Sequence, residues 1–263
     1  MASRAGLADP PSFVGLLAHP VRWRLLEELG RSDRAVRELT SLLDEPQNLV
    51  SYHLRLLREG GLVSARRSSF DARDSYYAID LQRCQRELQS TGGALHPGLW
   101  LVPVPPVTAA TSARRQRVLF LCTGNSARSQ MAEALIVQLS GGAIDAVSAG
   151  SNPKELHPNA VRAMRKYDID ISRNRTKHLD KFFGHRFDAV ITLCDRVREV
   201  CPDFPGQPRV MHWSIPDPAL DGPTNRASYP SFVHTAAELE TRIGFLVQQL
   251  NARPTRRSKH VQR

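Results

Sequence analysis

The sequence predicts two domains, the first mainly α-helical and the second an α/β domain with a four-stranded parallel sheet. Apolar residues recur with a helical period in the first part of the chain, whereas short apolar strands alternate with helices from residue 114 onward. A stretch rich in glycine and proline separates the two patterns, and 263 residues are enough for two cores. We therefore expect domains at 12–90 and 114–252, a linker at 91–113 and a basic tail at 253–263.

Helical periodicity places three helices in the first domain. The first apolar run breaks at Pro20, and Pro46 suits the first position of a later helix. That later helix is expected to end at Gly60 and Gly61, because glycine adopts the backbone conformation that commonly ends helices. The expected helices cover about residues 14–29, 36–43 and 46–59.

A hairpin is expected after the third helix, from strands at 62–65 and 75–79 around a charged tip. Two short helices, a third helix and a hairpin predict a winged helix-turn-helix. In such a domain the early polar residues of the recognition helix contact base edges in the major groove, although a solvated face on an accessory domain would show the same pattern. The predicted base contacts are Gln47, Asn48, Ser51, Tyr52, His53 and Arg55, the predicted phosphate contacts of the hairpin are Arg66, Arg67 and Arg73, and the residues expected to face the core are Leu49, Val50, Leu54 and Leu57.

Residues 17–26 read LAHPVRWRLL and residues 50–63 read VSYHLRLLREGGLV. With these segments the first domain resembles the ArsR-type repressors, which respond to arsenic and other metals. One short recognition helix covers one half-site, so we expect a homodimer on a palindromic operator. Many such repressors carry a cysteine pair where this chain has residues 34–39, which lack the thiolates that a soft As(III) site needs. Cys84 shares a helical stripe with leucines, and we expect it to pack at a dimer helix.

The second domain alternates strands with helices. Short apolar strands separated by helices imply a parallel sheet covered on both faces. A ligand site is expected beyond the carboxyl ends of those strands. The expected strands are 117–121, 143–148, 188–194 and 210–213, and the expected helices are 130–139, 157–166 and about 231–250.

Cys122 follows the first of these strands and opens a loop that leads into a helix. Backbone N–H groups of such a loop can turn inward, and the helix start adds positive potential. We expect Cys122 to be a thiolate nucleophile. Arg128, with five residues between it and Cys122, is expected to bind a tetrahedral oxyanion in a bidentate manner. An ordinary buried cysteine before a turn is the alternative. The predicted oxyanion-binding residues are Thr123, Gly124, Asn125, Ser126, Ala127, Arg128 and Ser129.

Residues 122–133 read CTGNSARSQMAE. This stretch resembles the low-molecular-weight protein tyrosine phosphatases and the thioredoxin-coupled arsenate reductases that share their fold. The reductases add a Cys-x6-Cys pair, which Cys194 and Cys201 match, and they often carry a loop cysteine where this chain has Ala127. Taken alone, Cys194 would most often be a buried strand cysteine. The resemblance implies that Cys122 attacks arsenate, Cys194 attacks the adduct and releases arsenite, and Cys201 then forms a disulfide with Cys194 that thioredoxin reduces.

Asp217, on the proline-stiffened loop Ile-Pro-Asp-Pro, is the expected general acid, although an Asp-Pro turn is the alternative. Some reductases of the family bind potassium near the loop. Here Lys177 stands at one of the matching positions, and its ammonium could replace the cation, so we predict neither a metal nor a bound cofactor. The other matching positions are Asn125, Glu133 and Ser148.

The formal charge of +10 suits a polyanionic partner. Four cysteines without a zinc-site spacing predict thiol chemistry in a reducing compartment. No apolar run approaches the roughly 20 residues that cross a bilayer, so we expect a cytoplasmic protein. Three functions are open: a DNA-binding regulator fused to an arsenate reductase, a tyrosine phosphatase fused to a DNA-binding domain, and a transcription factor with a non-catalytic oxyanion-sensing domain. The first is favoured, because Cys194 and Cys201 argue against a phosphatase and the Cys122, Arg128 and Asp217 set argues against a sensor.

Overall fold

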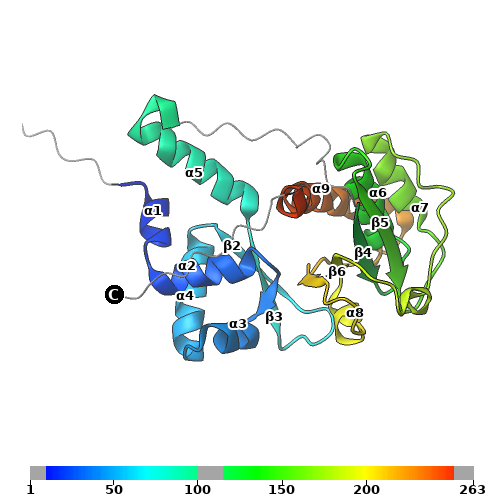
Figure 1. The fold of residues 1–263 in the computed structure, drawn as a ribbon, viewed down its shortest axis with the longest axis horizontal. Coiled ribbons are helices and arrows are strands. Elements are labelled where there is room, and N and C mark those ends of the chain that lie inside the picture. The colour runs from blue at the N-terminus through cyan, green and yellow to red at the C-terminus, as the bar shows by residue number, and fades with distance from the viewer. Residues whose placement is uncertain (1–9, 100–114, 252–263) are drawn as a thin grey trace, which may run out of the picture. The chain divides into compact units, whose positions relative to one another are not determined.

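The computed structural model describes residues 10–99 and 115–251. They fall into two units, one N-terminal and one C-terminal (Figure 1). Most of the predicted linker, 100–113, and the predicted basic tail, 253–263, lie outside the described residues. Within the described residues, no helix is long and apolar enough to cross a membrane.

Four helices form the body of the N-terminal unit. The side chain of His19 accepts a hydrogen bond from the Val21 N–H at the start of the second helix, and Glu38 accepts one from Ala35 at the start of the third. Asp44, in the left-handed conformation, ends the third helix before the turn. The helices are α1 (Ser12–Leu17), α2 (Pro20–Leu29), α3 (Val36–Leu43) and α4 (Gln47–Glu59), so the first predicted helical run, with its break at Pro20, is two helices, and the shared core includes Phe13, Leu25, Leu29, Leu39, Val50, Leu54 and Leu57.

A small antiparallel sheet completes the helix-turn-helix unit. Strands β2 (Val63–Arg67) and β3 (Ser75–Ile79) form the predicted hairpin, and the sheet order is β1-β3-β2. The two-residue strand β1 (Arg34–Ala35) was not predicted, since two residues carry no periodic pattern. Leu49, expected in the core, is only half-buried.

The glycine- and proline-rich stretch expected to be a linker from residue 91 begins as part of a helix. Helix α5 (Leu81–Leu95) runs through Gly92, and a short 3-10 turn follows at residues 97–99. Asp80 caps α5 by accepting a hydrogen bond from the Arg83 N–H at 2.7 Å. A Cβ at Gly92 would lie 2.5 Å from the Leu99 carbonyl oxygen. The glycine therefore allows the chain to fold back over the helix, a tertiary contact that local propensity does not reveal.

The C-terminal unit is the predicted α/β domain with a four-stranded parallel sheet. Its order is β5-β4-β6-β7, so β4 lies inside the sheet, and its residues 118–122 are buried. Register pairs Cys122 with Gly150 and Leu121 with Thr192. The strands are β4 (Gln116–Cys122), β5 (Ile144–Gly150), β6 (Ala189–Thr192) and β7 (Arg209–His212).

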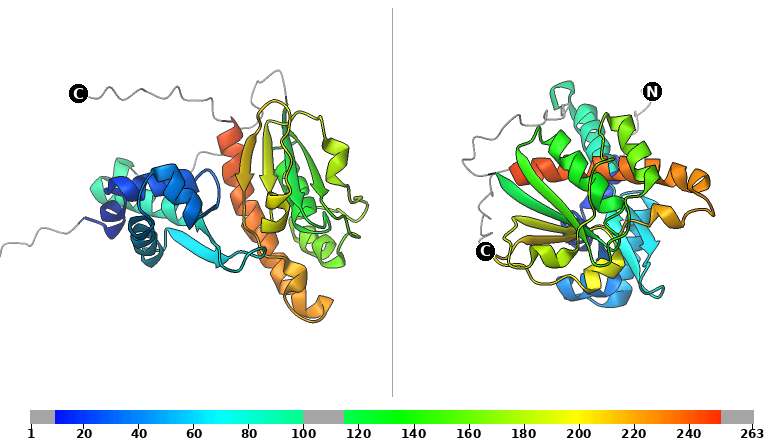
Figure 2. Two further views of the ribbon diagram at one scale, coloured as in Figure 1. Left: turned by 90° about the horizontal axis from the view of Figure 1, so that it is seen from below. Right: turned by 90° about the vertical axis from the view of Figure 1, so that its right-hand side faces the viewer.

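Helices pack around this sheet, and α9 runs alongside it in both views of Figure 2. Helix α9 begins at residue 225 rather than 231, because Thr224 accepts a hydrogen bond from the Ala227 N–H and Pro230 is tolerated inside the helix. The five-residue helix α8 was not predicted. The helices are α6 (Arg128–Leu139), α7 (Pro158–Met164), α8 (Asp195–Glu199) and α9 (Asn225–Asn251).

Candidate active site

The Cys122 thiol lies at the carboxyl end of β4, inside the loop that leads into α6. It is buried, and the Asn125 N–H donates a hydrogen bond to its sulfur at 3.2 Å. The Ser129 hydroxyl lies 3.0 Å from the same sulfur. Ser129 Oγ accepts from Asn125 Nδ2, and its own proton is available to donate to the sulfur when the sulfur is a thiolate. The loop therefore directs two donors at the position of an anionic sulfur.

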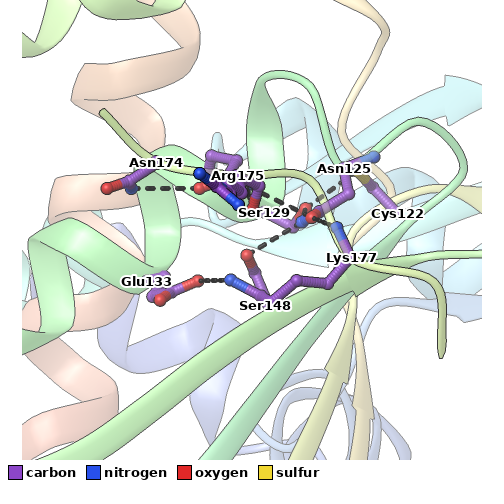
Figure 3. Close-up of polar contacts among 9 residues, drawn as sticks. Cys122, Asn125, Ser129, Glu133, Ser148, Asn174, Arg175 and Lys177 are labelled. Atoms are coloured by element: carbon purple, nitrogen blue, oxygen red, sulfur yellow. Dashed lines mark hydrogen bonds and ion pairs between the residues drawn. The ribbon is translucent and has the colours of Figure 1, made fainter. Parts of the chain in front are cut away.

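Asn125 fixes the loop from within. Its backbone is left-handed, with φ of 46°, a conformation that asparagine tolerates better than most residues. The side chain is fully buried, and its Nδ2 donates to Ser129 Oγ at 2.9 Å and to Ser148 Oγ at 2.8 Å. Its Oδ1 accepts from the Lys177 N–H at 2.7 Å. These contacts, shown in Figure 3, hold the strained residue in one arrangement.

A second group of side chains supports Asn125. Gln130 Nε2 donates to Asn125 Oδ1 at 3.2 Å and to the Arg175 carbonyl at 3.1 Å. Gln130 Oε1 accepts from Asn174 Nδ2 at 3.1 Å. Gln130 and Asn174 were missed in the sequence, because their contacts join segments more than 40 residues apart.

Lys177 stands at one of the positions that match the potassium site of some arsenate reductases. Its Nζ lies 3.2 Å from Glu133 Oε2 (Figure 3). A potassium ion and this ammonium would compete for one carboxylate, so the residues present do not fit a resident cation. Among the described residues, no group of three or more His, Cys, Asp or Glu side chains is placed to hold a metal ion.

Arg128 and Asp217 form an ion pair beside the loop. Arg128 Nη2 donates to Asp217 Oδ2 at 2.8 Å, and its Nη1 donates to the Ile215 carbonyl at 2.8 Å. The arginine is buried, while the carboxylate is more open to solvent. Asp217 Oδ1 also accepts from the Ala219 N–H, which orients the carboxyl group. An incoming oxyanion must therefore share or displace this pair.

Cys194 follows strand β6 and lies against the same loop. Its sulfur is 3.2 Å from the hydroxyl oxygen of Thr123. Burial raises the pKa of this thiol, and the positive charge of Arg128 opposes that rise. The structure thus brings Cys122, Cys194, Arg128 and Asp217 to one edge of the sheet.

Cys201 is half-buried and lies beyond α8, and no disulfide is formed by any of the four cysteines. Burial and the nearby Asp203 carboxylate raise the pKa of its thiol to about 11. Residues 195–199 separate it from Cys194 as a helix. The predicted relay thiols therefore lie at the two ends of one short helical segment.

The residues predicted to contact base edges lie on α4, and all but one of them are exposed. His53 is only 3% exposed, and its ring lies against that of His19, with centroids 4.2 Å apart and planes tilted by 39°. Burial and the neighbouring His19 lower the pKa of His53. Since His53 lies one helical turn from Val50 and Leu57, it shares their inward face and is not available to base edges. The exposed residues are Gln47, Asn48, Ser51, Tyr52 and Arg55.

The arginines of the hairpin differ in exposure. Arg67 and Arg73 are exposed, Arg67 donates to the Ala72 carbonyl, and Arg73 pairs with Asp71 at 2.9 Å. Arg66 is half-buried. Contact with phosphate would therefore require Arg73 to exchange its carboxylate partner.

Comparison with known proteins identifies both units. Residues 117–256 match the family described as low molecular weight phosphotyrosine protein phosphatase, and residues 17–65 match a helix-turn-helix domain family. The chain belongs to the low molecular weight phosphotyrosine protein phosphatase family. Its helix-turn-helix unit is fused to the amino-terminal side of that domain.

Similar members of the family are arsenate reductases. The chain is 38% identical over 126 residues to the arsenate reductase of Oceanobacillus iheyensis, covering 48% of this chain and 91% of that protein. It is 39% identical over 129 residues to the arsenate reductase of Bacillus licheniformis, covering 49% and 93%. Solved structures include the Corynebacterium glutamicum thioredoxin-dependent arsenate reductase Cg_ArsC1', with 29% identity, a TM-score of 0.42 and coverage of 53% of this chain and 64% of that chain.

Proposed function

We propose that the chain is a bifunctional arsenic-resistance protein, a DNA-binding regulator fused to an arsenate reductase. The contact of the Cys194 thiol with Thr123, inside the oxyanion loop, carries this proposal. A phosphatase needs one nucleophilic thiol at the loop, whereas reduction of arsenate needs a second thiol that can attack the first sulfur. The arsenate reductases among the relatives support the same assignment.

In the first step, arsenate binds at the loop N–H groups and at Arg128. The Cys122 thiolate attacks arsenic and forms a sulfur–arsenic bond, while one arsenic–oxygen bond breaks and that oxygen leaves as water. Asp217 supplies the proton to the departing oxygen. The Arg128–Asp217 ion pair makes oxyanion binding precede proton transfer. An oxyanion that binds the guanidinium releases the carboxyl group from the pair, and the carboxyl group can then carry a proton.

In the second step, the Cys194 thiolate attacks the sulfur of Cys122. A Cys122–Cys194 disulfide forms, the sulfur–arsenic bond breaks, and its electron pair stays on arsenic, which leaves as arsenite. Cys201 then attacks the sulfur of Cys194 and releases the Cys122 thiolate. The two electrons gained by arsenic thus come from two thiols, and the chain is left with a Cys194–Cys201 disulfide. A dithiol reductant such as thioredoxin restores both thiols.

The N-terminal unit binds a palindromic operator as a homodimer, as an ArsR-type repressor would. The exposed polar face of α4 supports this proposal, because its amide and guanidinium side chains can pair with base edges. The dimer is proposed to form through the N-terminal unit along α5. None of the side chains of this helix is buried in the described part of the chain, so the helix is available for contact with a second copy. Thiols that cycle between reduced and oxidised forms require a reducing compartment, so we place the protein in the cytoplasm.

A second candidate function is phosphate ester hydrolysis, which the family match favours. Phosphate and arsenate have the same tetrahedral geometry, so weak phosphatase activity is expected beside reduction. Hydrolysis uses Cys122 but not Cys194 or Cys201. The two functions therefore differ in the thiols that they consume.

The decisive experiment follows arsenate reduction by the full chain with thioredoxin, thioredoxin reductase and NADPH. We expect sustained NADPH oxidation and arsenite formation by the wild type, and a single round without sustained turnover by Cys201→Ser. Hydrolysis of an aryl phosphate is measured in parallel. If Cys201→Ser turns over arsenate like the wild type while the aryl phosphate is hydrolysed rapidly, the protein is a phosphatase.

A further inference from the structure

A strap at residues 150–157, between β5 and α7, holds the outer side of the oxyanion loop. Three of its N–H groups, those of Asn152, Lys154 and His157, donate to loop carbonyls at 2.9 Å each. The acceptors are the carbonyl oxygens of Thr123, Gly124 and Ser126, in the same order. Strap and loop thus run beside each other in the same direction.

These bonds fix the direction of the loop N–H groups. In a trans peptide the C=O of one residue and the N–H of the next point in opposite directions. A carbonyl of Gly124 that is bound to the strap therefore turns the N–H of Asn125 away from it. That N–H donates to the Cys122 sulfur at 3.2 Å, as this geometry requires. The same reasoning turns the N–H groups of Gly124 and Ala127 away from the strap.

Gly150 is the point where strap and loop approach most closely. It pairs with Cys122 in the sheet register and donates its own N–H to the Lys177 carbonyl at 2.9 Å. A Cβ at Gly150 would lie 2.5 Å from the Thr123 carbonyl oxygen and 2.8 Å from the Asn125 nitrogen. Both atoms belong to the backbone, so no side-chain rotation relieves the contact. Any larger residue must push the loop away.

The far end of the strap is anchored independently. The ring of His157 stacks on Phe232 of α9, with centroids 4.4 Å apart and planes 26° from parallel. Its Nδ1 accepts from the Asn159 N–H and caps α7. Because the strap is anchored at both ends, it cannot move together with a displaced loop.

We propose that the strap at residues 150–157 is a positioning element of the oxyanion site, and that Gly150 is a positioning residue which sets the direction of the loop N–H groups. This inference rests on the proposed role of the loop in binding an oxyanion. Relief of the 2.5 Å contact requires a shift of roughly 1 Å, because non-bonded atoms settle near 3.5 Å. A misplacement of that size costs about 10²-fold in reactions that depend on alignment.

The test compares Gly150→Ala with Gly244→Ala. Gly244 lies in α9, and a Cβ there meets nothing within 4 Å, so the control adds the same methyl group to the same domain without a clash. The probe is inorganic phosphate, which binds without consuming thiols. Alkylation of Cys122 by iodoacetamide is followed by mass spectrometry at increasing phosphate concentration, and circular dichroism and melting temperature report folding.

We expect Gly150→Ala to raise the half-protecting phosphate concentration by about tenfold or more, because misdirected N–H groups lose hydrogen bonds to a charged ligand, with Gly244→Ala like the wild type. A folded Gly150→Ala that binds phosphate like the wild type but melts at a lower temperature would make Gly150 merely structural and overturn the inference. If Gly150→Ala does not fold, a comparison of Lys154→Pro with Lys154→Ala tests the role of the strap. Proline removes the N–H that binds Gly124 and alanine keeps it, so only Lys154→Pro is expected to lose phosphate protection, and equal protection of the two variants would refute the strap.

Wild-type behaviour separates this inference from the proposed function. A wild type that turns over arsenate, with Gly150→Ala protected like Gly244→Ala, refutes the inference alone. A wild type whose Cys122 is neither protected by phosphate nor active on arsenate refutes the oxyanion site itself.

Discussion

Cys84 in the helix-turn-helix unit is half-buried and Cys122 in the α/β unit is buried, and the surroundings of the two thiols differ. Cys84 packs against the apolar core of its unit, and burial together with the Asp80 carboxylate raises its pKa to about 11. Cys122 instead faces a backbone N–H donor and the Ser129 hydroxyl. The comparison teaches that the groups around a thiol, and not its burial alone, distinguish a thiol that packs in a core from one that lies in a site.

The two units also differ in how far their functional groups are fixed in advance. In the α/β unit Asn125, Arg128 and Ser129 are buried and held by several hydrogen bonds. In the helix-turn-helix unit the polar face of α4 is exposed. Catalysis needs groups that are already aligned, whereas side chains that read DNA can take up their contacts on binding. Changes in the α/β unit should therefore have the larger effects.

The largest effect is expected from Cys122→Ser, which should reduce arsenate turnover to background, because a serine hydroxyl at this position is not ionised. Operator binding should be unchanged, since the recognition helix belongs to the other unit. Coupled turnover and a mobility shift are measured on the same preparation. Residual reduction above background by the serine variant would refute Cys122 as the nucleophile.

Asp217→Asn is expected to lower kcat for arsenate by about 10²–10⁴-fold, the usual contribution of a general acid. Asparagine keeps one acceptor oxygen, which can still accept from the Ala219 N–H, while its NH2 group replaces the oxygen that accepts from Arg128. Asp221→Asn is the matched control, because Asp221 is exposed and its carboxylate bonds Ser231. Equal kcat values for the two variants would exclude Asp217 as the acid.

The relay should depend on pH because the pKa of Cys201 is raised to about 11. Only the thiolate attacks, so formation of the Cys194–Cys201 disulfide should accelerate about tenfold per pH unit between roughly pH 7 and 9. Rapid quenching after one arsenate turnover and mass spectrometry measure this step. Asp203→Asn removes a carboxylate that raises the pKa and should shift the profile to lower pH. A rate that does not change over this range would contradict the assignment of Cys201.

The sequence was sufficient where local spacing determines the chemistry. The strand, loop and helix around Cys122 follow from adjacent residues, and the structure places them as predicted. His53 was misplaced among the base contacts although its helical spacing from Val50 already indicated an inward face. Helical periodicity, given more weight than the polarity of the side chain, predicts that His53 faces inward.

Other features could not be found in the sequence because they depend on contacts between distant segments. Gln130, which donates to Asn125, is itself held by Asn174 and Arg175, more than 40 residues away in the chain. The extension of α5 past Gly92 depends on its close approach to Leu99. Strand β1 and helix α8 are two and five residues long, which is too short for a periodic pattern.

In the helix-turn-helix unit, Asn48→Ala is expected to weaken operator binding about tenfold, since a good amide contact with adenine contributes about 1–3 kcal/mol. Asn48 is exposed at the start of α4, so the fold should tolerate the change. Arsenate turnover by the same variant is the control and should be unchanged. Binding to a non-specific fragment should also stay the same, because the residue reads a base. An equal loss on both fragments would place Asn48 at the phosphate backbone.

The smallest effect is expected from Cys84→Ser, which tests the comparison of the two thiols directly. With a pKa of about 11, Cys84 is protonated at neutral pH, and a single thiol makes a poor As(III) site because arsenic prefers several thiolates. Operator binding and its sensitivity to arsenite should therefore change by no more than about twofold, and stability by about 1 kcal/mol or less. If arsenite releases the wild type from DNA, Cys194→Ser and Cys201→Ser should lose that response, which places the sensor among the relay thiols. Mobility shifts with and without arsenite on these three variants measure it, and loss of the response in Cys84→Ser alone would move arsenic sensing to the helix-turn-helix unit.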